Sequence, residues 1–222
     1  MLYLVPTPIG NLDDMTSRAI DILQKVDIIL AEDTRVSGRL LKHYDIKTPM
    51  RSYHAHNEHA VVGRVLELFK EHEEIALITD AGTPGISDPG YLMVRACHQH
   101  HIKVSCLPGA NALIPALAMS GIPCDKFYFE GFLPHKKGRQ TRWKFLACLE
   151  CTIALYESTH RIIKCTKEMT EHLEANREVA IIKEISKLHE SIYRGQVSSL
   201  VSLVEEINSK GEFVIIIGPS RK

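Results

Sequence analysis

This sequence of 222 residues contains few cysteines, no long apolar run and no excess of charge of either sign. Its apolar runs are only a handful of residues long, far short of the roughly 20 that span a bilayer, so we predict no membrane segment. Six cysteines are too sparse for a disulfide framework, which favours a reducing compartment. The first residues, Met1–Pro6, have neither the basic leader nor the cleavage-type segment of a signal peptide. We therefore predict a cytoplasmic globular protein.

The balance of 27 basic against 27 acidic residues excludes a protein coated in positive potential, but the charges are unevenly distributed. Residues 131–149 contain five bases and no acid. These bases are Lys136, Lys137, Arg139, Arg142 and Lys144. Such a patch can meet phosphates even in a neutral protein, although a run of charge is more often a solvated helix face.

The first part of the chain alternates short apolar runs with amphipathic segments of helical spacing. The apolar runs predict strands at Leu2–Val5, Asp27–Ala31, Met50–Tyr53, Ile75–Thr79 and Lys103–Leu107. The amphipathic segments predict helices at Met15–Lys25, Ser37–His43, Val61–Glu71, Tyr91–His100 and Ala112–Met119. Strands that alternate with helices of this length need crossover connections, so we predict an α/β lobe with a mainly parallel sheet over residues 1–120.

A cluster of helix breakers, Ser120–Pro123, marks the predicted boundary to a second α/β lobe over residues 121–222. Strands are predicted there at Phe127–Glu130, Thr152–Glu157, Glu178–Lys183 and Phe213–Ile217. Helices are predicted at Arg139–Leu149, Ile162–Leu173 and Leu200–Asn208. The predicted fold class is therefore α/β, with two lobes.

Small, kinked or charged residues follow the predicted strands of the first lobe. These segments are Pro6–Leu12, Glu32–Arg35, Asp80–Gly90 and Pro108–Asn111. Ligands of an open parallel sheet bind beyond the carboxyl ends of its strands, so a cleft lined mostly by backbone is expected here. The Asp80–Gly90 loop has three glycines and two prolines, which make a closely approachable backbone. It matches neither a phosphate loop nor Gly-x-Gly-x-x-Gly, and from local chemistry alone it could be only a turn.

Several motifs together resemble the small-subunit ribosomal RNA methyltransferases of the tetrapyrrole methylase superfamily. The motifs are PTPIGNL at 6–12, EDTR at 32–35, DAGTPGISDPG at 80–90 and EGFLP at 130–134, with YESTHR at 156–161 and KEISK at 183–187. The resemblance runs through essentially the whole chain. It implies 2′-O-methylation of one cytidine ribose in the decoding centre of 16S rRNA, on the small ribosomal subunit, with S-adenosylmethionine (SAM) as donor. It also implies a homodimer, with SAM between the two lobes.

The sequence departs from the family pattern in two places. Family members commonly have proline where this chain has Thr159, which changes a turn. Many members also continue with a small C-terminal extension, whereas this sequence stops soon after Gly218–Pro219, and the extension is expected to be absent.

The resemblance also implies which residues contact SAM, largely through backbone groups. On the first lobe they are Pro8, Gly10, Asp80, Gly82, Ile86, Ser87, Gly109 and Ala110. On the second lobe they are Phe132, Leu133 and Pro219. Apolar walls suit an adenine and a thioether, while a few fixed donors and acceptors suit a carboxylate and a ribose.

Methyl transfer is a direct displacement that depends mainly on holding oxygen, carbon and sulfur in line. A ribose hydroxyl is a poor acid, so a base or a polarising group should assist. Glu32, Asp33 and Arg35 at a strand exit are the first catalytic candidates, followed by Asn57 and Glu58. The alternative for Glu32–Arg35 is a helix cap that pairs internally.

The basic segment over His135–Lys144 is the candidate RNA contact, with Trp143 either stacking on a base or packing in the core. No metal is predicted: Cys148 and Cys151 form a lone pair without a second pair at zinc spacing, and the histidines near Asn57 are typical of a solvated loop. Two alternatives stay open. One is methylation of a small tetrapyrrole or another acceptor, and the other is a non-catalytic SAM-sensing or RNA-binding module.

Overall fold

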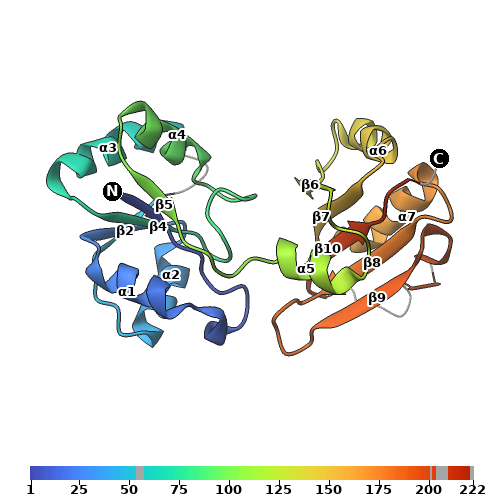
Figure 1. Cartoon of the computed structure of the whole chain (residues 1–222), viewed down its shortest axis with the longest axis horizontal. Helices are drawn as coiled ribbons and strands as arrows, with labels where there is room; N and C mark the ends of the chain where they lie inside the picture. The colour runs from blue at the N-terminus through green and yellow to red at the C-terminus, as the bar shows by residue number, and fades with distance from the viewer. Residues whose placement is uncertain (54–57, 201, 204–209, 221–222) are drawn as a thin grey trace. The chain divides into compact units, whose positions relative to one another are not determined.

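The computed structural model describes residues 1–53, 58–200, 202–203 and 210–220, with the backbone alone for residues 58–62, 64 and 65. The chain divides into two compact units, Met1–Asn111 and Ala112–Lys222, each with its own sheet and core (Figure 1). None of the helices in the described part of the chain is long and apolar enough to cross a bilayer.

The first unit is built on a five-stranded sheet in the order β3-β2-β4-β1-β5, in which every neighbouring pair is parallel. Its strands are β1 (Leu2–Leu4), β2 (Ile28–Ala31), β3 (Met50–Ser52), β4 (Ile75–Ile78) and β5 (Val104–Cys106). Its helices are α1 (Ser17–Lys25), α2 (Thr34–His43), α3 (Glu58–Glu71) and α4 (Tyr91–Gln99), with a short 3-10 turn η1 at Leu12–Asp14. This arrangement confirms the predicted parallel α/β lobe.

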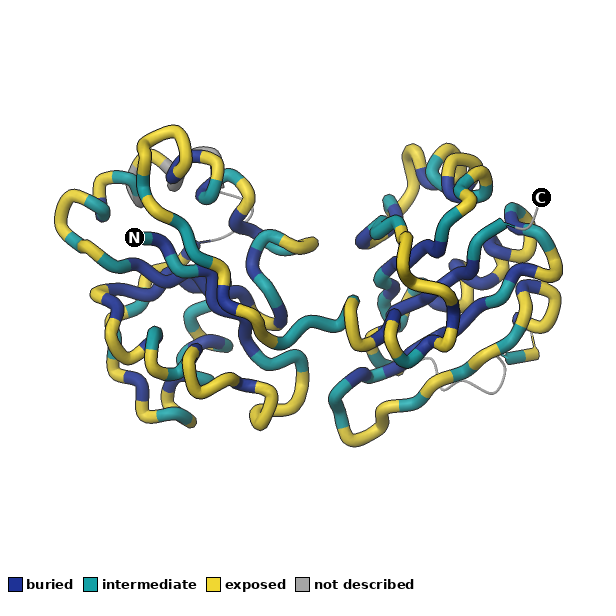
Figure 2. Tube along the Cα trace, viewed as in Figure 1, coloured by how far each residue is buried: buried dark blue, intermediate teal, exposed yellow. Residues whose placement is uncertain are grey.

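Helices cover both faces of this sheet. Successive residues of a strand point to opposite faces, so each central strand contributes to two cores. Ile29 and Ala31 of β2 join a core that includes residues of α1 and α2, whereas Ile28 and Leu30 join a core that includes residues of α3 and α4. Strands β2 and β4 are buried along their whole length (Figure 2). Their continuous apolar sequences are therefore those of central strands covered on both faces.

The second unit has a mixed five-stranded sheet in the order β6-β7-β10-β8-β9. Strand β6 pairs with β7 in parallel, and the other neighbouring pairs are antiparallel. The strands are β6 (Phe127–Phe132), β7 (Thr152–Ser158), β8 (Glu178–Lys183), β9 (Ser191–Gln196) and β10 (Glu212–Ile217). The helices are α5 (Leu113–Ser120), α6 (Arg139–Ala147) and α7 (Ile162–His172), with a 3-10 turn η3 at Val197–Ser199. Helices α6 and α7 pack their apolar sides into one core with this sheet.

Three features of the second unit differ from the sequence-based expectation. Helix α5 packs against β8 and β10, so the division between the units falls at Asn111, whereas the predicted boundary near residue 120 lies at the far end of this helix. Strand β9 was not predicted, because it is an edge strand whose alternating half-buried and exposed residues include few apolar ones. Most of the predicted helix at 200–208 lies outside the described residues.

Candidate active site

Loops that follow three parallel strands of the first unit are joined by hydrogen bonds at the carboxyl edge of the sheet. Thr7, after β1, donates its backbone N–H to the Gly82 carbonyl at 3.0 Å and accepts one from the Gly82 N–H at 2.9 Å. The Thr7 hydroxyl donates to the Thr79 carbonyl at 2.9 Å, and the Thr83 hydroxyl donates to the Ala110 carbonyl at 3.3 Å. The structure therefore brings together the predicted SAM-contacting segments after β1, β4 and β5.

Close packing or a positive φ requires glycine at two positions of this edge. A Cβ on Gly109 would lie 2.8 Å from Cβ of Pro6, a rigid ring that cannot move aside. Gly90 has φ of +139°, and a Cβ there would lie 3.2 Å from the Gly85 nitrogen. Between Gly85 and Gly90, Ile86 is 46% exposed and Ser87 has φ of +63°. The loop is thus a fixed surface with an exposed apolar side chain.

Asp33 and Arg35 form the internal pair that was the alternative to a catalytic role. Asp33 is the N-cap of α2, and its Oδ1 accepts from the Arg35 backbone N–H at 2.8 Å. The Arg35 guanidinium donates to both carboxylate oxygens, at 3.1 Å and 2.7 Å. Hydrogen bonds from Arg35 hold the pKa of the Asp33 carboxyl well below its usual range. Asp33 is therefore a weak base, and Arg35 is occupied by its neighbour.

Glu32 lies in a group of carboxylates that includes a residue missed by sequence reasoning. Glu32 Oε2 accepts from the Asp80 N–H at 3.4 Å, and Asp80 Oδ1 accepts from the Asp33 N–H at 3.1 Å. Asp88 is near enough for both negative charges to act on it. Burial, followed by the charges of Glu32 and Asp80, raises the pKa of Asp88 to about 7. The only sequence signal for Asp88 was its place inside the Asp80–Gly90 loop.

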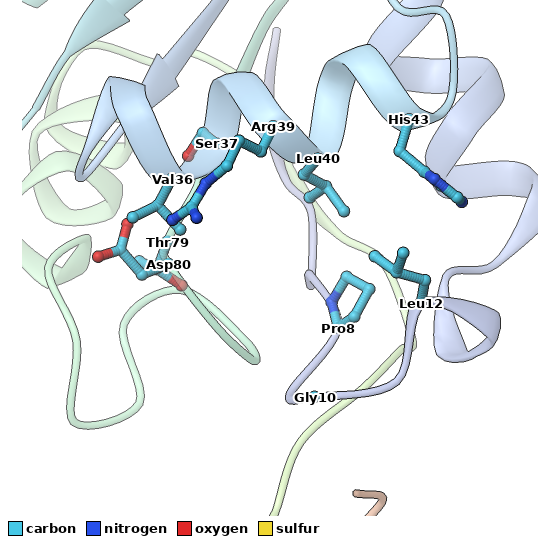
Figure 3. Close-up of a pocket in the computed structure, with 10 residues that line it drawn as sticks. All are labelled: Pro8, Gly10, Leu12, Val36, Ser37, Arg39, Leu40, His43, Thr79 and Asp80. Carbon is cyan, nitrogen blue, oxygen red and sulfur yellow. The ribbon is translucent and has the colours of Figure 1, made fainter.

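A pocket of about 360 Å³ lies beside these loops in the first unit (Figure 3). The loop after β1, helix α2 and the end of β4 supply its walls. The lining residues are Pro8, Gly10, Leu12, Val36, Ser37, Arg39, Leu40, His43, Thr79 and Asp80. Of these, Pro8, Gly10 and Asp80 belong to the predicted SAM contacts, whereas the residues on α2 were not singled out from the sequence.

In the second unit, Arg161 fixes the end of β6, where two predicted SAM contacts lie. Its Nη1 donates to the Leu133 carbonyl at 3.0 Å, and its guanidinium carbon lies 5.7 Å from the Phe132 ring centroid. Its Nε pairs with buried Glu157 at 2.7 Å. Phe132 is 51% exposed, while Leu133 is buried. Arg177 similarly donates from Nε to the Gly218 carbonyl, next to Pro219.

Arg139 does not belong to an exposed basic face, contrary to the sequence-based expectation. Only 2% of the residue is exposed, and its guanidinium pairs with Glu168 at 2.7 Å and with Glu157 at 3.2 Å. Trp143 is also fully buried, and its Nε1 donates to Glu168 at 3.0 Å. Arg139 is therefore part of the core, where it neutralises two buried carboxylates. Trp143 also packs in the core, which was the alternative to stacking on a base.

The other predicted RNA-contacting bases fall into two groups. Arg142 is half-buried; its Nε donates to Glu130 at 2.8 Å and its Nη2 donates to the Tyr128 hydroxyl at 2.8 Å. Lys136, Lys137 and Lys144 are exposed, and they make no side-chain ion pair with any residue that the structure describes. The free positive charge of this segment therefore comes from its lysines.

The described residues contain no group of three or more histidine, cysteine or acidic side chains that could hold a metal ion. Cys148 and Cys151 are free cysteines. Asn57, a second-rank candidate base, lies outside the described residues, as does the Glu58 side chain.

Comparison with known proteins places these features in a family. The family described as Tetrapyrrole (Corrin/Porphyrin) Methylases matches residues 1–201. A cobalt precorrin-4 methyltransferase of cobalamin biosynthesis has the same fold, with a TM-score of 0.66 at 19% identity over 98% of this chain and 94% of that one. A uroporphyrin-III C-methyltransferase from Thermus thermophilus, solved with S-adenosyl homocysteine, also has a TM-score of 0.66, at 15% identity over 98% of this chain and 96% of that one.

Curated relatives are much more similar in sequence. A protein of Pasteurella multocida named ribosomal RNA small subunit methyltransferase I is 49% identical over 98% of this chain and 78% of its own length. Proteins of the same name from Synechocystis and Thermotoga maritima are 47% and 42% identical, covering 98% and 97% of this chain and 78% and 97% of their own lengths. This chain belongs to the tetrapyrrole methylase family and, within it, to the group of ribosomal RNA small subunit methyltransferase I.

Proposed function

We propose that this chain transfers the methyl group of SAM to the ribose 2′-oxygen of a cytidine in the decoding centre of 16S rRNA. The observation that supports this best is the match of nearly the whole chain to proteins named ribosomal RNA small subunit methyltransferase I, at 42–49% identity. The small ribosomal subunit is the proposed partner. A cytoplasmic homodimer is proposed with it.

SAM is proposed to contact the joined loops of the first unit, at Pro8, Gly10, Asp80, Gly82, Ile86, Ser87, Gly109 and Ala110. Support comes from the rigid carbonyl and amide groups of these loops and from the exposed Ile86 side chain. Phe132 and Pro219 are kept as proposed contacts because neither is buried, whereas Leu133 would contribute through its backbone.

The proposed reaction is a single displacement. The ribose oxygen attacks the methyl carbon, an oxygen–carbon bond forms, the carbon–sulfur bond breaks, and S-adenosylhomocysteine leaves as a neutral thioether. The hydroxyl proton passes to a base on the protein. Positive charge disappears from sulfur during the step, so a dry site does not oppose it.

Among the three residues first considered for catalysis, Glu32 remains the candidate base, and Asp88 joins it. A carboxylate with a pKa near 7 combines adequate basicity with a useful ionised fraction at neutral pH, whereas the lowered pKa of Asp33 argues against it. Glu32→Gln and Asp88→Asn should each be assayed for turnover and for SAM affinity. Loss of turnover with SAM affinity retained supports the role, and unchanged turnover removes the residue from it.

RNA binding is proposed for Lys136, Lys137 and Lys144. Arg139 is left out because it is buried, and Arg142 is left out because it pairs with Glu130. Replacing Lys136 and Lys137 by glutamate should weaken binding to rRNA and flatten its salt dependence. Lys167→Glu is the matched control, because Lys167 is an exposed lysine on α7 of the same unit. An equal effect of the control would mean that the lysines act only through net charge.

The decisive experiment incubates the protein with radiolabelled SAM and small ribosomal subunits that lack the modification, beside naked rRNA. Mapping of a 2′-O-methyl group to a decoding-centre cytidine would establish substrate and reaction together. Transfer to a tetrapyrrole instead would support the alternative acceptor, and SAM binding without any transfer would support the non-catalytic module. Light scattering of the purified protein alone tests the homodimer.

A further inference from the structure

Most of the pocket beside the joined loops of the first unit has no part in the proposed cofactor site. Pro8, Gly10 and Asp80 are shared with the proposed SAM contacts. The remaining wall comes mainly from Leu12 and from one side of α2. Because the pocket and the proposed cofactor loops share residues, a ligand in the pocket would lie next to the methyl donor.

The two ends of the pocket differ in chemistry (Figure 3). Arg39 extends from α2 toward the end where Asp80 lies, while Pro8, Leu12 and Leu40 gather at the other end. The Arg39 side chain is exposed, and it makes no hydrogen bond or ion pair with any residue the structure describes. Leu12 is 41% exposed. One end thus offers a free cation beside the Asp80 carboxylate, and the other offers an apolar surface next to His43.

The walls of the pocket are held in place before any ligand arrives. The Tyr44 hydroxyl at the end of α2 donates to the Leu12 carbonyl at 2.5 Å. Asn11 caps the 3-10 turn that begins at Leu12, with its Oδ1 accepting from the Asp13 N–H at 3.1 Å. At the opposite end, the bond from the Asp33 N–H to Asp80 joins the start of α2 to the loop after β4. Because these walls are already ordered, a ligand that binds there loses less free energy to the ordering of side chains and loops.

We propose that this pocket holds the acceptor nucleotide after it has turned out of the RNA, with Arg39 against its phosphate and Leu12 and Leu40 against its base. The inference rests on the proposed function and assigns a place to its substrate. A nucleotide combines an anionic group with an apolar base face, which is the combination that the two ends supply. Bases in single-stranded loops of RNA are unstacked, so they are free to turn out and pack against protein side chains.

The size and charge of the pocket favour a nucleotide over a tetrapyrrole. Its volume of about 360 Å³ is at the small end of the roughly 300–1,000 Å³ found for ligand pockets. A macrocycle of four pyrroles with many carboxylates needs more room and several cations. Among the described residues that line the pocket, Arg39 is the one arginine or lysine.

Binding of a fluorescently labelled RNA hairpin that contains the decoding-centre segment tests the inference without methyl transfer. The hairpin is titrated in the presence of S-adenosylhomocysteine, and anisotropy is measured at several salt concentrations. Arg39→Ala should weaken binding about 10- to 100-fold and reduce the salt slope by about 1. Lys42→Ala is the matched control, because Lys42 is exposed on the same helix and does not line the pocket.

A second variant tests the apolar end. Leu12→Trp should obstruct the base and weaken hairpin binding, whereas Leu188→Trp, at a residue 92% exposed in the second unit, should not. SAM affinity, measured by calorimetry, should be unchanged in Arg39→Ala and Leu12→Trp.

The inference is overturned if Arg39→Ala binds the hairpin as Lys42→Ala does, or if either pocket variant loses SAM, which would make the pocket part of the cofactor site. Failure of the proposed function gives a different pattern. The wild type would then transfer no methyl group to small subunits, while its RNA binding would still depend on Arg39.

Discussion

Replacing Asp88 by asparagine should stabilise the first unit at alkaline pH and change little near pH 4. Burial and the charges of Glu32 and Asp80 raise the pKa of Asp88 from 3.8 to about 7. The folded state therefore binds this proton more tightly than the unfolded state. Its contribution to stability is fully present below about pH 4 and is lost as pH rises through about 7. Asparagine cannot ionise, so the Asp88→Asn variant does not lose stability as pH rises through about 7.

The expected size follows from the pKa shift. A shift of about three units corresponds to about 4 kcal/mol as an upper limit. Asp88 is partly exposed, and solvent screens it, so we expect a gain of about 2 kcal/mol at pH 8. Glu32→Gln removes one of the neighbouring charges and should lower the pKa of Asp88 toward its ordinary value.

Hydrogen exchange of the β1 and β4 amides is the suitable assay, because the single tryptophan, Trp143, reports on the second unit. Exchange is measured at pH 5 and pH 8 for wild type, Asp88→Asn and Asp21→Asn, the last being an exposed acid on α1. A gain of the same size at both pH values, or one shared by Asp21→Asn, would refute the reasoning.

Three further predictions concern packing. Arg139→Met should destabilise the second unit by about 3–5 kcal/mol, because Glu157 and Glu168 lose a buried cation; a Trp143 fluorescence midpoint in urea as high as that of wild type would contradict this. Gly109→Ala should lower SAM affinity, since the new Cβ would meet Pro6 at 2.8 Å, and an unchanged affinity in calorimetry would show that this loop does not contact SAM. Ser37→Ala should raise the free energy of unfolding by about 1 kcal/mol, because the buried Ser37 hydroxyl has no hydrogen-bond partner among the described residues. Denaturant unfolding followed by circular dichroism measures this free energy, and a destabilised variant would contradict the prediction.

Local sequence was sufficient for the strands and α-helices of the first unit. Its central strands are continuous apolar runs and its helices are amphipathic, so period and composition agree with the observed structure. Strand β9 lacked this signal, because an edge strand with one sheet neighbour needs little apolar sequence. The membership of α5 in the second unit was also inaccessible, since an apolar helix is equally consistent with packing on either sheet.

The candidate site shows the same division. Motif resemblance identified the loops after β1, β2 and β4. In the loops after β1 and β4, tight turns favour glycine and proline, which makes the sequence distinctive. Charge runs were less informative. Arg139 lies four residues upstream of Trp143, and both turn into the core, whereas Lys136 and Lys137 just before the helix face solvent.

The sequence by itself determined the α/β class, the family and the loops of the carboxyl edge, because periodicity and tightly packed backbone are written in short stretches of residues. Only the tertiary structure decided which charges are available. Arg35 and Arg139 are occupied by carboxylates, Arg39 is free among the described residues, and the pKa of Asp88 is raised to about 7. The physical reason is that a charge depends on its burial and on neighbours that come from distant parts of the chain.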